Sequence, residues 1–160
     1  MEINKDVFVQ QGILDHQISQ LIEYSHHDPN VKKFTSDPKR FADKASFYQW
    51  QQQGRIIYTL TDSSKNLLGI IWFGQKDPPL KTIKANFTFA IRIYGMARGQ
   101  GLSQKFMKIT FDDLLKNQKD SHITGFWLET SSENFAAIHT YQKFGFKVVD
   151  KVNHSLVMVL

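Results

Sequence analysis

The stretch YGMARGQGLSQKFM, residues 94–107, places three glycines and one arginine directly before a segment with helical periodicity. Glycine loses more conformational entropy on folding than other residues, so glycines this close together indicate that the backbone itself has a task. The first turn of a helix presents free N–H groups and a partial positive charge, which Gly99 and Gly101 would let a ligand approach. With the charge of Arg98 added, the turn predicts a binding site for a phosphate or diphosphate group.

Two common phosphate-binding motifs do not account for this turn. The Walker motif needs a Gly-Lys-Ser/Thr sequence, which the chain lacks. The dinucleotide pattern G-x-G-x-x-G fails because Gln104 stands three positions after Gly101. The alternative to a ligand site is an ordinary turn into a helix that Ser103 caps, and the turn alone leaves both interpretations open.

Apolar periodicity on either side of the turn predicts a mixed sheet with helices on its faces. We expect helices at 15–24, 41–54, 102–118 and 134–144, and strands at 3–9, 55–62, 67–74, 85–94, 123–130, 146–153 and 155–160. The polar segment 26–41 contains two prolines and several cations, which predicts a loop.

The composition is that of a folded globular protein, with 41% hydrophobic residues in a chain of 160, enough for one domain with a core. No cysteine is present, which excludes disulfides, thiolate metal sites and a cysteine acyl-enzyme. Only His26 and His27 are adjacent histidines, and neighbours in a helix or strand point apart, so we expect no metal site. Since no segment resembles a signal peptide or reaches membrane-spanning length, we expect a cytoplasmic protein without a membrane partner.

A second informative stretch is LETSSENFAAIHTYQKFGF, residues 128–146. Asn134 and Tyr141 are seven positions apart, which on a helix is two turns less about 20°, so they share a face with Ala137 and Ile138 between them. Taken singly, Asn134 could be a helix N-cap and Tyr141 a core tyrosine with its hydroxyl at the rim. Their combination with an upstream phosphate turn favours a ligand site.

Together the two stretches resemble the GNAT superfamily of acetyl-CoA-dependent N-acetyltransferases. Residues 98–103, RGQGLS, match the family's coenzyme loop R/Q-x-x-G-x-G/A except at Ser103, which is small enough for that position. Residues 134–146 are similar to the later signature N-x-x-A-x-x-x-Y-x-K-x-G-F. The element order fits over essentially the whole chain. The resemblance therefore implies an α/β (α+β) fold in one N-acetyltransferase domain, residues 1–160, with about six to seven strands splayed between the fourth and the fifth.

The resemblance also implies where acetyl-CoA binds. The backbone of the turn would hold the diphosphate, and these residues are Arg98, Gly99, Gln100, Gly101, Leu102 and Ser103. The preceding strand, around Ile91, Arg92 and Ile93, would pair through its main chain with the pantetheine arm, as an added strand does. On the following helix, Asn134 would hydrogen-bond the arm, and Ala137 and Tyr141 would complete the coenzyme site.

Acetyl transfer to an amine requires a base, an oxyanion site and a proton for the leaving thiolate. A lysine-type amine has a pKa of about 10.4, so a base must take its proton, directly or through water. N–H groups of a splayed strand can supply the oxyanion site. Tyrosine, with a pKa of about 10, stays protonated at neutral pH, and we assign Tyr141 as the proton donor.

Glu129 is the candidate base because the strand of the coenzyme arm carries no acidic residue and the next strand does. Leu128-Glu129-Thr130 resembles the LEV-type segment of ribosomal-protein alanine N-acetyltransferases, in which the glutamate is the proposed base. The alternative is a solvated carboxylate at a strand end. Glu133 fits a capping box with Thr130 and is interpreted as structural.

The sequence thus predicts an acyltransferase of the EC 2.3.1 class that transfers acetyl directly to an amine in a ternary complex, as a monomer or homodimer. One alternative is a non-catalytic acetyl-CoA-binding domain of the same fold. Another follows from the formal net charge of +5 and the basic stretch Lys32, Lys33, Lys39, Arg40 and Lys44, which would allow a nucleic-acid-binding domain. No RNA-binding or helix-turn-helix motif accompanies that stretch, so we expect a solvated face and no nucleic acid partner.

The family implies an acceptor groove built from residues 25–45 and 75–86, which leaves open whether the amine is a small molecule, a protein N-terminus or a lysine.

Overall fold

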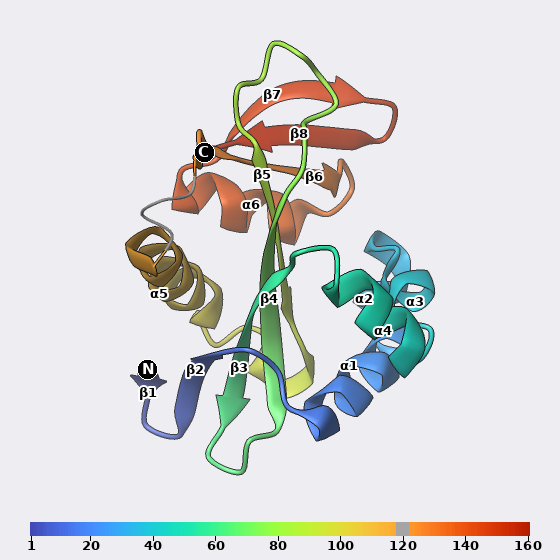
Figure 1. The fold of residues 1–160 in the computed structure, drawn as a ribbon, viewed down its shortest axis with the longest axis vertical. Coiled ribbons are helices and arrows are strands. Elements are labelled where there is room, and N and C mark those ends of the chain that lie inside the picture. Colours follow the sequence, from blue (N-terminus) through green and yellow to red (C-terminus); the bar gives the residue numbers. More distant parts are fainter. Residues whose placement is uncertain (118–121) are drawn as a thin grey trace.

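The computed structural model describes residues 1–117 and 122–160, so Gln118 of the helix expected at 102–118 lies outside the described residues. The helices are α1 (Asp15–His27), α2 (Pro29–Phe34), α3 (Asp37–Arg40), α4 (Lys44–Gln51), α5 (Leu102–Asn117) and α6 (Phe135–Phe144), with a 3-10 helix η1 at Gly95–Ala97. The strands are β1 (Glu2–Asn4), β2 (Val7–Gln11), β3 (Ile56–Asp62), β4 (Leu67–Gln75), β5 (Phe87–Ile93), β6 (Phe126–Ser131), β7 (Lys147–Val152) and β8 (Ser155–Val159). They form one sheet in the order β1-β2-β3-β4-β5-β6-β8-β7 (Figure 1).

The mixed sheet with helices is confirmed, but the described part of the chain has eight strands rather than six or seven. The extra strand comes from the segment expected as a single strand at 3–9. That segment folds back on itself between β1 and β2, and Asp6 adopts a positive φ of 71° in the turn.

The expected loop at 26–41 is wrong in part, because α2 and α3 lie within it. Asp28 caps α2: one oxygen of its carboxylate accepts the N–H of Asn30 at 3.0 Å and that of Val31 at 3.2 Å. Pro29 occupies the first helical position, where a missing N–H costs nothing. The same Asp-Pro pair recurs at the start of α3, so these prolines begin helices rather than prevent them.

The sheet splits between β5 and β6, the strands expected to diverge. These strands pair in parallel at only two positions, Phe87 with Phe126 and Thr88 with Trp127. Beyond these pairs β5 continues along β4, whereas β6 continues along β8. The two halves of the sheet therefore separate toward the C-terminal ends of both strands.

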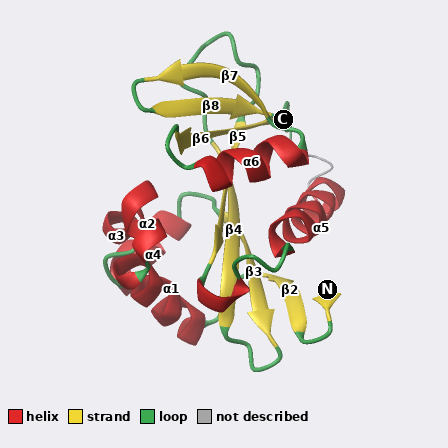
Figure 2. Cartoon of the chain, turned by 180° about the vertical axis from the view of Figure 1, so that it is seen from behind, coloured by secondary structure: helices red, strands yellow, loops and turns green. Residues whose placement is uncertain are grey.

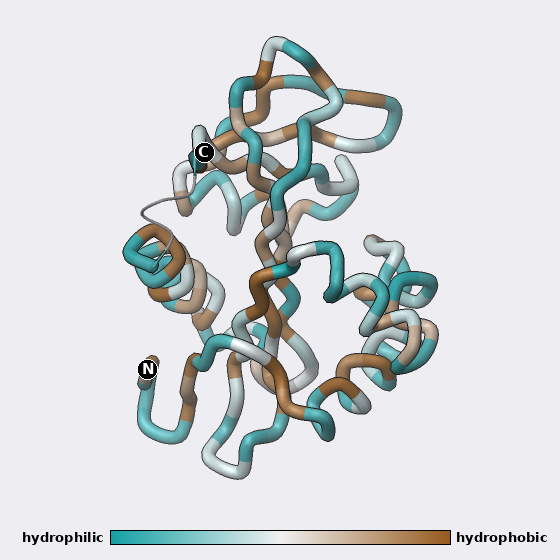
Figure 3. The backbone as a smooth tube through the Cα atoms, in the orientation of Figure 1, coloured by the Kyte–Doolittle hydropathy of each residue, from teal (hydrophilic) through white to brown (hydrophobic). Residues whose placement is uncertain are grey.

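The central strands are buried on both faces, which explains their nearly continuous apolar sequences. Side chains such as Phe73 and Phe89 face α5 and α6, whereas Ile70 and Trp72 face the group α1 to α4. Figure 2 shows α5 on one side of these strands and the α1 to α4 group on the other. Figure 3 shows apolar residues concentrated along the central strands. Within the described residues, no helix is both long and apolar enough to cross a membrane.

Candidate active site

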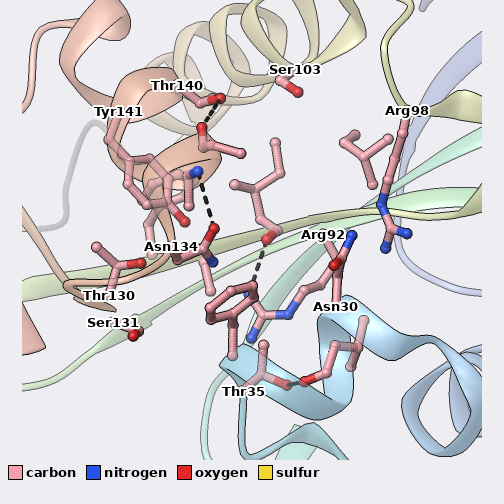
Figure 4. A pocket seen from close by; sticks show the side chains of 18 of the residues that line it. Asn30, Thr35, Arg92, Arg98, Ser103, Thr130, Ser131, Asn134, Thr140 and Tyr141 are labelled. Carbon is pink, nitrogen blue, oxygen red and sulfur yellow. Dashed lines mark hydrogen bonds between the residues drawn. The ribbon is translucent and has the colours of Figure 1, made fainter. Parts of the chain in front are cut away.

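A cavity of about 540 Å³ opens where β5 and β6 separate. Six parts of the chain line it: α2 with Thr35, the C-terminal part of β5, the turn at 97–103, the end of β6, the first two turns of α6 and the first residue of β8. Figure 4 shows Tyr141 and Asn134 on one side of the cavity, with Asn30, Thr35 and Arg92 opposite them. The cavity therefore brings together the two sequence stretches predicted to form one site.

The gap between the strands exposes main-chain groups that a sheet normally pairs. Tyr94 donates its N–H to Leu68 on β4, so in this regular antiparallel ladder the even-numbered residues of β5 face β4. The N–H and C=O groups of Phe89, Ile91 and Ile93 consequently face the gap. Of the three residues predicted to pair with an added chain, Ile91 and Ile93 have this orientation, whereas the main chain of Arg92 is used by β4.

The glycine turn leaves open space at the N-terminus of α5. Gly99 and Gly101 have φ angles of +76° and +69°, which side chains of L-residues rarely adopt, and a Cβ on either would meet nothing within 4 Å. Helix α5 begins at Leu102, so Ser103 lies in its first turn and is not the residue before it that a cap requires. Since the first N–H groups of a helix have no intrahelical partner, this turn has the geometry for binding an anion.

Arg98 lines the same cavity, but its charge is already paired. Its Nη2 lies 2.6 Å from Oδ2 of Asp28, the residue that caps α2. The Asp28 side chain is 8% exposed and that of Arg98 is 34% exposed. The sequence predicted that the positive charge of Arg98 would be available to a ligand, but in this structure the Asp28 carboxylate neutralises it.

Tyr141 is buried in the wall formed by α6. Its ring packs edge-on against Phe89 with centroids 5.7 Å apart, and both residues line the cavity. Burial raises the pKa of Tyr141, with the nearby Arg92 charge opposing that effect. The hydroxyl consequently remains a proton donor across the neutral range.

Asn134 both caps α6 and lines the cavity. Its side-chain oxygen accepts the N–H of Ala137 at 3.2 Å and so caps α6. The side-chain amide nitrogen makes no hydrogen bond within the part of the chain that the structure describes. Because Asn134 and Ala137 both line the cavity, this amide is able to donate into it.

Glu129 lies at the mouth of the cavity and is exposed. Glu129 pairs with Val157 in the β6–β8 ladder, and Trp127, two positions earlier, packs against Val157. The intervening Leu128 belongs to the core on the side of α6. Because side chains alternate along a strand, Glu129 projects from the face opposite α6. Glu129 and Tyr141 therefore lie on opposite faces of the sheet.

Arg92 belongs to a buried charge cluster on the side of α3. Its Nε lies 2.6 Å from the fully buried carboxylate of Asp37, which also pairs with Arg40. The Arg92 guanidinium lies over the ring of Trp72, 4.9 Å from the centroid, and donates from Nη1 to the carbonyl of Ile91 at 2.9 Å. Burial opposes the charge of Arg92, but the Asp37 carboxylate holds the guanidinium pKa above its usual value.

The α2 residues that line the cavity lie within residues 25–45, which the family resemblance assigned to the acceptor groove, although a helix was not expected there. Thr130, Thr140 and Ser155 were not predicted to line the cavity. The Asp-Pro pair at 28–29 was the one local signal for α2. Residues 75–86, expected in the acceptor groove, are not among the described residues that line this cavity.

In the basic stretch, Lys44 pairs with Asp15 and Arg40 with Asp37, whereas Lys32, Lys33 and Lys39 are exposed. No group of three or more metal-ligating side chains occurs within residues 1–117 and 122–160.

Comparison with known families identifies one match. The model of the acetyltransferase (GNAT) family matches residues 20–146, which include the glycine turn, both splayed strands and α6. No curated protein matches the sequence.

Solved structures share the fold at low sequence identity. A spermidine N-acetyltransferase from Vibrio cholerae, in complex with CoA and spermine, superposes with a TM-score of 0.71 and 15% identity, covering 98% of this chain and 94% of the other. Aminoglycoside acetyltransferase AAC(6')-Ib in complex with coenzyme A gives 0.73 and 16%, covering 96% and 94%. The putative acetyltransferase yncA from Salmonella typhimurium, with acetyl-CoA, gives 0.67 and 15%, covering 97% and 93%. At these identities the likeness concerns the fold.

Proposed function

Because the chain belongs to the acetyltransferase (GNAT) family, we propose that it transfers acetyl from acetyl-CoA directly to an amine in a ternary complex. The observation that carries this proposal is the cavity between β5 and β6, which joins a glycine turn, main-chain groups of β5 that β6 does not pair, and a buried tyrosine. Bound acetyl-CoA would supply the thioester, the activated form of acetyl. The protein would supply the orientation and the movement of protons.

Three parts of the wall suit a coenzyme A molecule. The open turn at Gly99 and Gly101, with the free N–H groups of α5, suits a diphosphate. The gap-facing main-chain groups of Ile91 and Ile93 suit the amides of an extended arm, because they can form the hydrogen bonds of an added strand. The amide nitrogen of Asn134, which has no hydrogen-bond partner among the described residues, could donate to the same arm from the opposite wall.

Tyr141 is the proposed proton donor to the leaving thiolate. A model thiol has a pKa of about 8.5, so a phenol that is neutral at the working pH can share its proton with a thiolate. Burial raises the Tyr141 pKa and so favours the neutral form that this role requires. The gap-facing N–H groups of β5 could donate to the carbonyl oxygen as negative charge develops there.

Glu129 is the proposed base that receives the amine proton, directly or through water. Its exposed position on the face away from α6 suits an amine that approaches from the side of α2, opposite the leaving group. The finer resemblance of Leu128-Glu129-Thr130 to ribosomal-protein alanine N-acetyltransferases is part of this proposal. It keeps a protein N-terminus among the candidate acceptors.

The acceptor is proposed only as an amine. Two of the similar structures are named as acetyltransferases of spermidine and of aminoglycosides, so both compound types belong in a test panel with peptides and lysine side chains. We also propose that the protein is cytoplasmic and is a monomer or a homodimer.

The test is thiol release from acetyl-CoA with each amine of this panel and without amine. We expect release that depends on at least one amine and saturates with both substrates. Tight binding of coenzyme without amine-dependent release would favour a non-catalytic coenzyme-binding domain. Salt-dependent binding to DNA or RNA that coenzyme does not affect would favour the nucleic-acid alternative.

A further inference from the structure

Two arginine–aspartate pairs connect the coenzyme side of the cavity to the short helices on the other side. Arg98 of the glycine turn pairs with Asp28 at the start of α2, and Arg92 of β5 pairs with Asp37 in α3. Both arginines line the cavity, and neither aspartate does. The position of α2 is therefore coupled by charge to the part of the chain proposed to bind the diphosphate.

The two pairs differ in whether a ligand can compete for the arginine. Asp37 is fully buried and the side chain of Arg92 is 16% exposed, so an anion in the cavity reaches little of that pair. The side chain of Arg98 is 34% exposed beside the open turn at Gly99. Its guanidinium is thus accessible from the cavity, although Asp28 holds one of its nitrogens.

Asp28 divides its two oxygens between two tasks. Oδ1 accepts the N–H groups of Asn30 and Val31 and caps α2. Oδ2 accepts only Arg98 among the described residues. The cap can therefore persist when Arg98 leaves, while the link between α2 and the glycine turn is lost.

We propose that Asp28 is a positioning residue: it holds Arg98 in the coenzyme-free protein and releases it to the diphosphate when coenzyme binds. This inference rests on the proposed function, because it needs a diphosphate at the glycine turn. Coenzyme binding then unlinks α2 from the turn, and α2 forms the wall of the cavity that the amine would meet. The ion pair stabilises the coenzyme-free state alone, so it opposes binding by its own free energy.

A competing pair of this kind has a signature that a purely structural pair lacks. Its removal should destabilise the coenzyme-free protein and, by linkage, strengthen coenzyme binding to the same degree. If the pair merely supports the fold, its removal would lower the stability of the coenzyme-free and the coenzyme-bound protein equally and leave the affinity unchanged. A pair that orients Arg98 for the diphosphate would, when removed, weaken binding.

The experiment measures the Kd of coenzyme A by calorimetry and the Tm with and without coenzyme A. The variant is Asp28→Asn, because asparagine caps a helix as well as aspartate does and lacks the charge. The matched control is Asp15→Asn, which removes the exposed pair with Lys44 away from the cavity. Because Asp28 also repels a diphosphate at a distance, the same substitution is repeated in an Arg98→Gln background.

We expect Asp28→Asn to lower the Tm of the coenzyme-free protein and to tighten coenzyme A binding by about three- to fivefold, the range of a partly exposed pair. In the Arg98→Gln background the gain should shrink to near one, and Asp15→Asn should leave Kd unchanged. An unchanged or weaker affinity in Asp28→Asn overturns the inference, as does an equal gain in both backgrounds. If the parent does not bind coenzyme A, the proposed function fails as well, whereas normal binding with no response to Asp28→Asn overturns this inference alone.

Discussion

The hydroxyl of Tyr141 is the most specific group in the candidate site. Tyr141→Phe keeps the ring that packs against Phe89 and removes only the proton donor. We expect kcat to fall by about 10²-fold or more, the typical contribution of general acid catalysis, with the Kd for acetyl-CoA and the Tm near those of the parent. Steady-state kinetics and calorimetry provide the check.

Tyr94→Phe is the matched control, because Tyr94 is buried outside the cavity and its hydroxyl has no hydrogen-bond partner in the described residues. Its kcat should equal that of the parent. Full turnover by a folded Tyr141→Phe protein under chemistry-limited conditions would leave Tyr141 as a packing residue.

The raised pKa of Tyr141 also predicts the alkaline side of the pH profile. Burial shifts this pKa upward from about 10, so the neutral donor form persists at all pH values below that value. Activity should therefore rise with pH as the amine loses its proton, with no decline from tyrosine ionisation up to about pH 10. A decline in kcat between pH 7 and pH 9, with the protein still folded, would argue against the assigned donor.

Glu129 makes a different prediction because its role concerns the amine. Glu129→Gln should lower the rate most at low pH, where the smallest fraction of amine is neutral, and should leave acetyl-CoA affinity nearly unchanged. Glu133→Gln, a neighbouring change outside the cavity, is the control. Equal pH–rate profiles for Glu129→Gln and the parent would make Glu129 a solvated carboxylate at a strand end.

For individual residues, the sequence indicated which ones form the site better than it indicated which residues they contact. The family resemblance predicted that the turn at Gly99–Gly101 and the helix face of Asn134 and Tyr141 would form one site, and all of these residues except Gln100 line the same cavity. The sequence could not reveal that Arg98 pairs with Asp28, because the two residues are 70 positions apart and nothing local links them. Long-range pairing depends on the tertiary arrangement.

Among the elements, the glycine turn at the start of α5 carries the coenzyme prediction. Gly101→Asp adds a side chain and a negative charge where the diphosphate is proposed to lie. Gly101→Asn is its matched control, because both residues tolerate a positive φ better than most and are nearly equal in size. Both should bind less tightly than the parent, with Asp much weaker than Asn, and the Tm rise with acetyl-CoA should disappear in Gly101→Asp. A parent-like rise in folded Gly101→Asp would place the diphosphate elsewhere.

The junction between α3 and β5 depends on the buried carboxylate of Asp37. Asp37→Asn leaves Arg92 and Arg40 without their counter-charge in a buried site. We expect the free energy of unfolding to fall by about 3–5 kcal/mol, as when one partner of a buried pair is removed. Urea unfolding measures this, with Asp15→Asn as the control, because an exposed ion pair contributes little to stability. A loss no larger than that of Asp15→Asn would show that the cluster contributes little to stability.

Long elements with clear periodicity were predictable from the sequence, and short ones were not. Helices α5 and α6 and strands β3 to β6 have apolar patterns that their burial explains. Helices α2 and α3 contain six and four residues, too few for a periodic pattern, and their polar, proline-containing sequence resembles a loop. Asp28 caps α2 and Asp37 is the first residue of α3, and the importance of both emerges only from the arginines that pair with them.

For the molecule as a whole, the order of strands and helices predicted the mixed sheet, and the family resemblance predicted the pair of strands that separate. The additional strand arose because residues 2–11 form a hairpin, whose reversal at Asp6 has no glycine to mark it. That one N-acetyltransferase domain spans residues 1–160 stays a prediction. The acceptor could not be predicted because the cavity wall on the side of α2 is mostly uncharged, so no charge pattern there selects an amine.

Direct transfer of acetyl from acetyl-CoA to an amine can be followed by isotopic labelling. Acetyl-CoA with a deuterated acetyl group is incubated with the protein and each amine, and both products and protein are examined by mass spectrometry. We expect labelled amide on at least one amine, much less with Tyr141→Phe, and no label retained on the protein when amine is absent. Labelled protein without amine would contradict direct transfer, and coenzyme binding without labelled amide from any amine would contradict the claim of catalysis.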